Sequence, residues 1–266
     1  MRNTSRTARR AAEIRQIATE VAARSGQAYI GQALGTADIL ACVYEIGITR
    51  PGDRFVLSPG HYGLALYAAN AHLYDRDELM TYGMDGSDFE QSPLEGLPGV
   101  EITGGSLGQG LSQSAGMAIG QRIKGIPGTI FCLLSDGEIQ EGQIWEAMLT
   151  IGHHKLSNLC VIVDRNGIQV DGRTEEVIDL EPLADKFRAF GFETVEVDGH
   201  DLPHLEASIE AALTGAAGRA YAIICDTVIG KGVPAFEAYP YPHYVNAEPA
   251  VWDEALRHLS AVAPEG

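Results

Sequence analysis

Short apolar runs alternate with amphipathic segments along most of the chain. The apolar runs are as long as strands and apolar at consecutive positions, which is typical of strands covered on both faces. The first of these runs starts at residue 53, and the others lie at 129–137, 158–167, 192–197 and 221–229. The segments around them carry apolar residues at helical spacing, in 7–24, 36–45, 61–74, 140–154, 182–190 and 202–213. The alternation predicts an α/β fold with a mostly parallel central sheet and helices on both faces.

We expect a single domain over residues 1–266, because the sequence shows no internal repeat, low-complexity segment or linker. Two stretches lack a regular pattern. Residues 82–105 are rich in Gly, Pro and Ser and predict a long loop, and loops of that length are often functional. The C-terminal tail from about 230 concentrates Gly, Pro and Tyr, and we expect it to be irregular.

The charge balance excludes some partners. Lys and Arg number 19 against 36 Asp and Glu, a net charge of −17, which disfavours nucleic acid and anionic membranes. An anionic ligand would need a metal ion or backbone N–H groups. The four cysteines show no CxxC spacing and lie in apolar runs, which indicates reduced thiols and the cytoplasm. No apolar run approaches a membrane span of about 20 residues, and no secretory signal is evident.

Polar residues follow two of the apolar runs at the point where each strand should end. Asp136 follows "TIFCLLS", and Asn166 follows "NLCVIVDR". In parallel sheets ligands bind beyond the carboxyl ends of the strands, so neighbouring strands would place these residues side by side. A carboxylate, an amide oxygen and a backbone carbonyl suit Mg²⁺. Gly137 would let a diphosphate approach the backbone, near a helix starting at about Gln140.

Simpler interpretations stay open for both residues. Asp136 could serve only to cap the following helix, since acidic residues favour helix N-termini. Asn166 could be an ordinary turn residue, which is the commonest use of an Asn-Gly pair. The turn residues alone do not decide between these interpretations and a metal site.

Several ordered blocks resemble the transketolase family. They are "DRFVLSPGH", "GVEITGGSLGQGLSQSAGMAIG", "SDGEIQEGQIWEA", "HHKLSNLCVIVDRNGIQVDG", "VDGHD" and "TVIGKGV", and they extend over most of the chain. The pair formed by "SDG" and the later Asn-bearing turn is similar to the thiamine diphosphate motif. The resemblance implies the thiamine diphosphate-binding fold, with thiamine diphosphate and Mg²⁺ as cofactors, Ca²⁺ or Mn²⁺ being possible substitutes.

The resemblance implies roles for the residues around the two turns. Asp136 and Asn166 would be metal ligands, with the Ile168 carbonyl as the third ligand from the protein. Gly137 and His61 would contact the cofactor diphosphate.

Further roles follow from the other blocks of the resemblance. Gly105 and Leu107 would line the aminopyrimidine of the cofactor. His243, in "YPHYVN", is similar to a histidine near the diphosphate, so that it and His61 would be the catalytic residues of this chain. Glu141 and Glu146 are similar to acidic residues at the subunit interface of transketolases; Glu138 receives no role.

The substrate side departs from the family pattern. Tyr29 stands where the family has a histidine, although a two-residue shift of the local alignment would place Gln27 there. Ser92 replaces a second histidine, and Ser135 replaces the first glycine of the cofactor motif. Tyr29 and Ser92, together with His61, would contact the donor substrate, and neither Tyr nor Ser takes up or releases a proton near neutral pH as histidine does. The resemblance therefore implies retained cofactor machinery and an altered substrate.

Transketolases continue into a second domain that supplies the glutamate acting on the aminopyrimidine, and the residues after His243 leave no room for it. The resemblance thus implies a split enzyme, in which a separate C-terminal, pyrimidine-domain chain completes the site in an α2β2 heterotetramer. The expected reaction is transfer of a two-carbon ketol unit from a ketose-type donor to an acceptor carbonyl. Two alternatives stay open: a 2-oxo-acid decarboxylating acyl or acyloin transferase, and a non-catalytic cofactor-binding partner.

Overall fold

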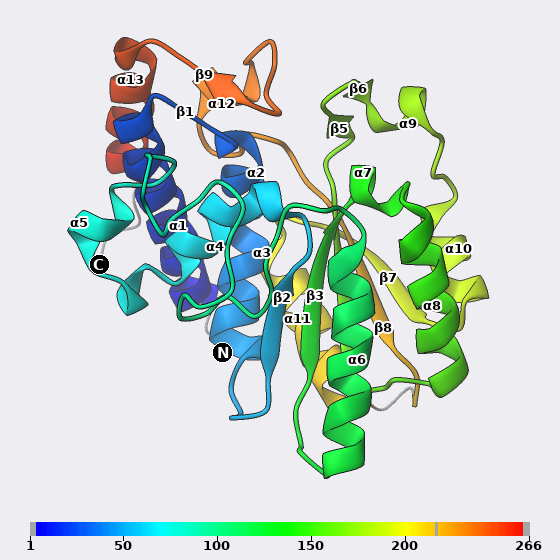
Figure 1. The fold of residues 1–266 in the computed structure, drawn as a ribbon. Helices are drawn as coiled ribbons and strands as arrows, with labels where there is room; N and C mark the ends of the chain where they lie inside the picture. The colour runs from blue at the N-terminus through cyan, green and yellow to red at the C-terminus, as the bar shows by residue number, and fades with distance from the viewer. Residues whose placement is uncertain (1–3, 216–217, 263–266) are drawn as a thin grey trace.

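A five-stranded parallel sheet forms the centre of the protein (Figure 1). The structure is a computed structural model that describes residues 4–215 and 218–262. The strand order is β2-β3-β4-β8-β7, and every neighbouring pair is parallel. The strands are β2 Arg54–Leu57, β3 Ile130–Ser135, β4 Leu159–Arg165, β8 Tyr221–Asp226 and β7 Glu193–Asp198. The predicted α/β fold with a parallel sheet is confirmed.

The central strands are buried on both faces, which explains their unbroken apolar sequences. In β3, Phe131 and Leu133 belong to one hydrophobic cluster, whereas Cys132 and Leu134 belong to the other. Successive side chains of a strand point to opposite faces, so a strand between two layers of helices must be apolar at every position.

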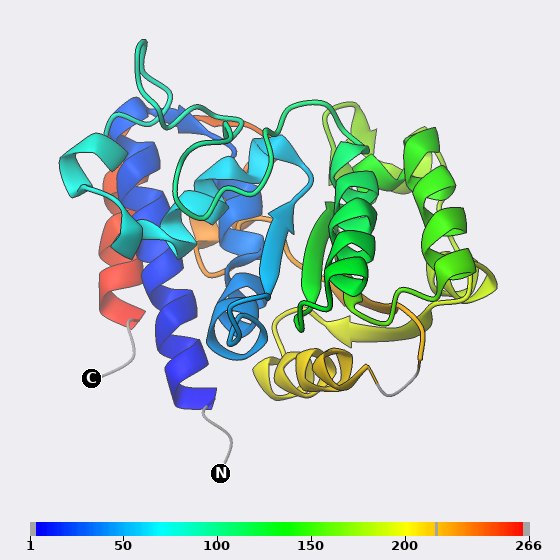
Figure 2. The same cartoon turned by 60° about the horizontal axis from the view of Figure 1, so that its bottom comes forward.

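Helices cover both faces of the sheet (Figure 2). One face carries α6 Gln109–Lys124, α8 Gly142–His154 and α10 Leu183–Ala189. The other face carries α3 Ala37–Cys42, which continues into a π-helical turn at Val43–Gly47, and α11 Leu202–Thr214. Among the described helices, none combines the length and apolar character needed to cross a membrane.

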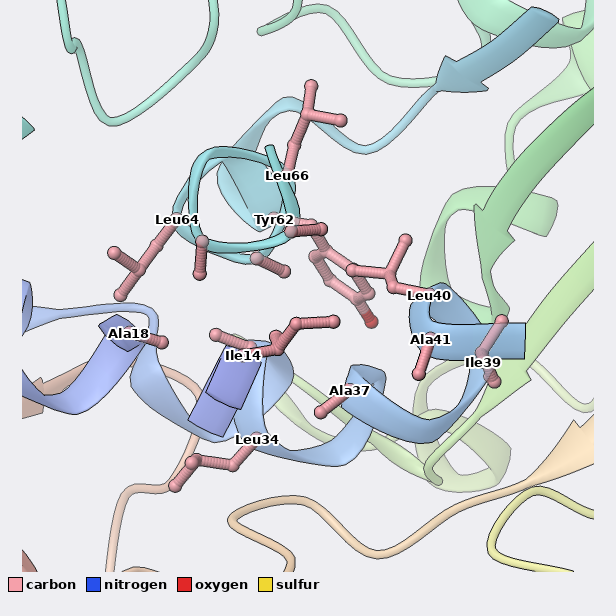
Figure 3. Packing of buried hydrophobic residues seen from close by; sticks show 14 of the residues in the cluster. Ile14, Ala18, Leu34, Ala37, Ile39, Leu40, Ala41, Tyr62, Leu64 and Leu66 are labelled. Carbon is pink, nitrogen blue, oxygen red and sulfur yellow. The ribbon is translucent and has the colours of Figure 1, made fainter. Parts of the chain in front are cut away.

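A second group of helices packs beside the β2 edge of the sheet (Figure 1). Figure 3 shows Ile14 of α1 pointing toward the Tyr62 ring, and Ala18 of α1, Leu34 of α2 and Ala37 of α3 belong to the same hydrophobic cluster. The helices of this group are α1 Thr4–Ser25, α2 Ile30–Gly35, α3, α4 Gly63–Ala69 and α13 Pro249–Val262.

The C-terminal tail differs from the expectation of an irregular segment from about 230. It contains α12 Pro234–Glu237, β9 Val245–Asn246 and α13. In α13, Trp252, Ala255 and Leu259 are buried, and their three- and four-residue spacing is that of one helix face. The expectation was wrong for the tail after 246, where a helix docks against α1.

The predicted long loop over 82–105 is confirmed, since it contains only an isolated bridge between Glu95 and Leu97.

Short elements connect the layers of the fold. The remaining elements are β1 Gln27–Ala28, the 3₁₀ turns Gly60–Tyr62 and Ala71–Leu73, α5 Arg76–Leu79, α7 Asp136–Ile139, β5 Ile168–Gln169, β6 Gly172–Arg173 and α9 Thr174–Val177.

Candidate active site

The ends of β3 and β4 bring the two predicted polar turns together. The strands are direct neighbours, and Ser135 pairs in register with Asp164. Asp136 and Asn166 therefore follow their strands at the same edge of the sheet. The one-turn helix α7 begins at Asp136, earlier than the predicted start near Gln140, so the carboxylate lies at a helix N-terminus.

Asp136 is held by donors from three segments. Its Oδ1 accepts from the Gly137 N–H at 2.8 Å, and its Oδ2 accepts from the Gly167 N–H at 2.7 Å and the Thr174 hydroxyl at 3.1 Å. Burial, and then the nearby Asp164 carboxylate, raises the pKa of Asp136 to about 7. No Lys or Arg of the described chain forms an ion pair with it. No basic side chain of the described chain therefore offsets the charge of Asp136 when it is ionised.

The side chain of Asn166 is oriented by a second buried acid. Its Nδ2 donates to Asp164 Oδ2 at 2.7 Å and to the Tyr62 hydroxyl oxygen at 3.0 Å. Its Oδ1 accepts from the Ile168 N–H at 3.0 Å. These contacts fix which end of the amide faces Asp164 and which end faces the β5 turn.

Asp164 is the hub of this arrangement, and sequence reasoning missed it. Its side chain is fully buried and also accepts hydrogen bonds from the hydroxyls of Tyr62, at 2.6 Å, and Thr227. Burial raises the pKa of the Asp164 carboxyl, and these donors oppose that rise. The available signal was a carboxylate inside the apolar run of β4, two positions before Asn166.

Glu138 is a third buried acid at this edge. Its Oε1 accepts from the Ser58 hydroxyl at 2.6 Å and from the Gly108 N–H at 2.8 Å, whereas its Oε2 has no partner among the described residues. Burial raises its pKa to about 7. Glu138, to which the sequence assigned no role, thus joins the loop after β2 to the start of α6.

A divalent cation suits the charge and the donor set at this edge. The buried carboxyl groups of Asp136 and Asp164 lie close enough for the charge of Asp164 to raise the pKa of Asp136, and no Lys or Arg of the described chain forms an ion pair with either. Among the described residues, no group of three His, Cys, Asp or Glu side chains is arranged to hold a metal ion. The predicted ligand set contains only one carboxylate, with an amide and a backbone carbonyl, and such hard oxygen donors suit Mg²⁺. The metal assignment stays a prediction.

A cavity of about 460 Å³ opens at this edge, and its walls bring together most of the predicted site residues. Of those residues, it is lined by Tyr29, His61, Ser92, Gly105, Leu107, Asp136, Gly137, Glu141, Ile168 and His243. Asn166 lies beside it but does not line it, and neither does Glu146. Tyr62, Gln140 and Gln169 line the cavity without having been predicted.

An aromatic cluster forms one part of the cavity wall. The His61 ring lies 5.2 Å from the Tyr29 ring and 5.1 Å from the His243 ring. Burial, and then the neighbouring His243, lowers the pKa of His61 to about 3; burial also lowers the pKa of His243. Both imidazoles are therefore neutral in the cavity at neutral pH.

The pairing of β1 with β9 brings this cluster together. Ala28 pairs with Val245, which places Tyr29 beside the segment that carries His243. Gln27, the alternative occupant of the family histidine position, is exposed on β1 and does not line the cavity. Tyr29 therefore occupies this part of the wall.

Two glycine-containing loops approach each other closely at the cavity. A Cβ added to Gly60 would lie 2.3 Å from the backbone nitrogen of Gly105, a distance that atoms do not tolerate. Gly105 itself has a φ of +121°, a conformation that favours glycine. The loops that carry His61 and Leu107 can therefore meet only because Gly60 lacks a side chain, and the backbone conformation at Gly105 favours glycine for a separate reason.

Glu141 and Glu146 are exposed at the N-terminal part of α8. Glu141 is the N-cap residue of that helix, and Glu146 lies just over one turn further along. An interface role for them stays a prediction.

The sequence matches the family described as transketolase, thiamine diphosphate binding domain, over residues 6–244. It is 35% identical to the 6-deoxy-6-sulfo-D-fructose transketolase subunit SqwG of Clostridium sp. (strain MSTE9), over 92% of this chain and 93% of that one. It is 31% identical to an apulose-4-phosphate transketolase subunit of Phocaeicola vulgatus, over 91% and 89% of the two chains.

Solved structures agree with these relatives. The transketolase of Campylobacter jejuni superposes with a TM-score of 0.84 at 28% identity. The match covers 96% of this chain and 43% of that one. The chain therefore belongs to the transketolase family and comprises its thiamine diphosphate-binding domain.

Proposed function

We propose that the chain is the diphosphate-binding subunit of a two-chain transketolase-like enzyme. The enzyme transfers a two-carbon ketol unit from a ketose-type donor to an acceptor carbonyl. The observation that carries the proposal is the cavity in which the Asp136 turn and the His61–His243 pair meet. The acidic Asp136 turn suits a metal ion with its diphosphate. The neutral His61–His243 pair suits the hydroxyl groups of a ketose donor.

The cofactor end of the cavity is assigned to Mg²⁺ and thiamine diphosphate. Asp136, Asn166 and the carbonyl of Ile168 would hold the metal ion, and Gly137 and His61 would contact the diphosphate. Thiamine diphosphate, when bound, supplies the nucleophilic carbon for cleavage of a carbon–carbon bond beside a ketone. The contribution of this chain is to orient the diphosphate and to neutralise the buried acids through the metal ion.

The donor end is assigned to the aromatic cluster and the loop beside it. Neutral His61 and His243 can each donate one hydrogen bond to a ligand oxygen without carrying charge. Tyr29 and Ser92 line the same cavity and would contact donor hydroxyl groups. Both side chains can donate or accept hydrogen bonds, and they replace histidines of the family.

A separate pyrimidine-domain chain is assigned to the open side of the cavity, in an α2β2 heterotetramer in the cytoplasm. Two relatives of similar length carry the word subunit in their names. Gly105 and Leu107 would meet the aminopyrimidine beneath that partner. The exposed Glu141 and Glu146 would lie in an interface between chains.

Reconstitution tests the proposal. The chain and its pyrimidine-domain partner are purified separately and together, and ketol transfer is assayed with thiamine diphosphate and Mg²⁺. The donor panel contains ketose phosphates, 6-deoxy-6-sulfo-D-fructose, apulose 4-phosphate and 2-oxo acids. We expect ketol transfer only with both chains present, and its loss when the metal is chelated before assembly.

Two results would contradict the proposal. Full activity of this chain alone would exclude a site completed by a partner. Turnover of 2-oxo acids with no ketose consumed would assign the site to decarboxylation instead.

A further inference from the structure

A buried glutamine contacts His243 from behind the cavity wall. Gln32 lies in α2 and is 1% exposed. Its Nε2 lies 2.9 Å from the carbonyl oxygen of His243 and 3.1 Å from Nδ1 of the same residue. One amide group therefore holds both the backbone and the ring of His243.

The chemistry of these two contacts fixes where the imidazole proton lies. A carbonyl oxygen only accepts hydrogen bonds, so the Gln32 atom facing it must be the NH₂ group and not the amide oxygen. The same NH₂ group faces Nδ1 of His243 and can only donate to it. Nδ1 must therefore carry a lone pair, and the proton of the neutral ring lies on Nε2.

We propose that Gln32 is a positioning residue that holds His243 as its Nε2–H tautomer and so presents an N–H donor to a ligand oxygen in the cavity. His243 lines the cavity, and among the described residues no hydrogen bond engages its Nε2. The tautomer depends only on contacts within this chain, whereas its use toward a ligand rests on the proposed function. The ligand oxygen belongs to the cofactor diphosphate or to the ketose donor.

The position of Gln32 carries an energetic penalty that an apolar residue would avoid. Its Oε1 is buried and has no hydrogen-bond partner within the described chain, which costs about 1–3 kcal/mol. The other residues of α2 are also buried but apolar or glycine: Ile30, Gly31, Ala33, Leu34 and Gly35. The unpartnered Oε1 of Gln32 lowers stability, so the presence of a polar side chain at this position needs an explanation. Its two hydrogen bonds to His243 supply that explanation.

The surroundings keep the His243 ring in the same place from its other sides. The Tyr29 ring meets it edge-on at 5.6 Å, and the His61 ring lies 5.1 Å away. Neither residue forms a hydrogen bond to Nδ1, so Gln32 alone among the described residues decides which nitrogen carries the proton.

Histidine ¹⁵N spectra of the full-length chain test the tautomer directly. We expect the Nδ1 signal of wild-type His243 to be that of an unprotonated nitrogen and the Nε2 signal that of a protonated one, with assignment by loss of signals in His243→Asn. Gln32→Glu places an acceptor against Nδ1 and should move the proton there. Gln32→Met removes the donor and should shift both signals toward a mixture of tautomers. Protonated Nδ1 in the wild type, or wild-type signals in either Gln32 variant, would overturn the proposal.

Cofactor binding and turnover of the assembled enzyme then test whether the Nε2–H group of His243 donates a hydrogen bond to a ligand. Loss of one hydrogen bond to a charged or polar oxygen corresponds to about a tenfold effect. In Gln32→Glu, which holds the proton on Nδ1, a tenfold weaker affinity for thiamine diphosphate with Mg²⁺ assigns the acceptor to the diphosphate. Gln32→Met still contains the Nε2–H tautomer in its mixture, so the same affinity should fall only about twofold in that variant. An unchanged cofactor affinity in Gln32→Glu with a tenfold lower kcat/KM for the ketose assigns the acceptor oxygen to the ketose substrate.

A matched control is Gln16→Glu, since among the described residues the Gln16 side chain bonds only Glu20 of α1. If neither cofactor affinity nor kcat/KM changes in Gln32→Glu relative to this control, the Nε2–H group of His243 does not bind a ligand in the cavity. If no ketose reacts even in the wild type, the proposed function fails, and the ¹⁵N spectra still decide the tautomer independently.

Discussion

The Asp136 carboxylate accepts a hydrogen bond of 2.7 Å from the backbone N–H of Gly167, across the gap between the ends of β3 and β4. This bond joins the turn that carries Asp136 to the turn that carries Asn166. Because the two turns follow separate strands, the distance between them depends on this contact as well as on the sheet. Asp136 is therefore both a metal ligand in the proposed function and a brace for the second ligand.

Asp136→Ala should abolish Mg²⁺-dependent binding of thiamine diphosphate. Substitution of a residue that hydrogen-bonds to a metal ligand commonly weakens metal affinity by about 10–100-fold. Removal of a charged ligand itself should have a larger effect. Asn166→Ala should weaken binding less, since an amide oxygen contributes no charge. Calorimetry on the assembled complex measures both, with Asp185→Ala on the surface of α10 as the control. Unchanged affinity in Asp136→Ala would place the metal elsewhere.

The buried neutral state of His61 predicts a pH-dependent stability. The pKa of His61 is about 3 in the folded chain and about 6.5 in the unfolded chain. Between these values the unfolded chain binds a proton that the folded chain does not, so stability is full above about pH 6.5 and falls as the pH falls. From pH 7.5 to 5.5 this residue should remove about 1 kcal/mol from the free energy of unfolding.

The comparison of wild type with His61→Gln isolates that contribution. Urea unfolding at both pH values, without metal or cofactor, should show a smaller pH effect in His61→Gln by about 1 kcal/mol. The acids Asp136 and Glu138 act in the opposite direction, because their pKa values are raised, but they are common to both proteins. His72→Gln, at an exposed position, is the control. Equal pH effects in wild type and His61→Gln would mean that His61 is not held neutral by burial.

The Ser58 hydroxyl predicts a large stability effect from a small change. It donates to Glu138 Oε1 at 2.6 Å and accepts from the Gly110 N–H at 3.1 Å, and it is buried. Ser58→Ala would leave two buried polar groups each short of one partner, so it should lower the free energy of unfolding by about 1–3 kcal/mol. Ser260→Ala, at an exposed hydroxyl of α13, should change it by less than about 0.5 kcal/mol. Equal effects of both changes in denaturant titrations would contradict this account of Glu138.

The sheet and the Asp136–Asn166 pair could be predicted from the sequence because both depend on local patterns. Strands buried on two faces are apolar at every position, and parallel neighbours deliver their following turns to one edge. The two turns meet because β3 and β4, which are consecutive long apolar runs, pair directly.

The contacts of Gln32, Asp164 and Glu138 could not be predicted, because they join residues far apart in the sequence. Gln32 and His243 are separated by 211 positions and are brought together by long-range contacts such as the pairing of β1 with β9. Ser58 and Glu138 are 80 positions apart. No spacing rule relates such residues, and a buried polar side chain in one helix looks the same as a solvated one until its partner is placed. The α13 helix was not predicted for a simpler reason. The Gly, Pro and Tyr residues that precede it indicated an irregular tail, and its apolar positions are too few to counter that indication.

The final prediction concerns Tyr29 and Ser92, which line the cavity and which the resemblance places at positions where the family has histidines. Tyr29→His combined with Ser92→His should alter the preference among ketose donors and leave the affinity for thiamine diphosphate within about twofold, because neither residue is assigned to the metal ion or the diphosphate. Sites that hydrogen-bond a substrate hydroxyl discriminate by up to about 10⁴-fold against analogues that leave polar groups unpaired, so two residues are enough to redirect specificity. The measurement is kcat/KM over several ketose phosphates and 2-oxo acids, with Gln27→His, at the exposed alternative position, as the control. Identical relative preferences in wild type and the double variant would show that these side chains do not touch the donor, and the altered substrate would then need another explanation.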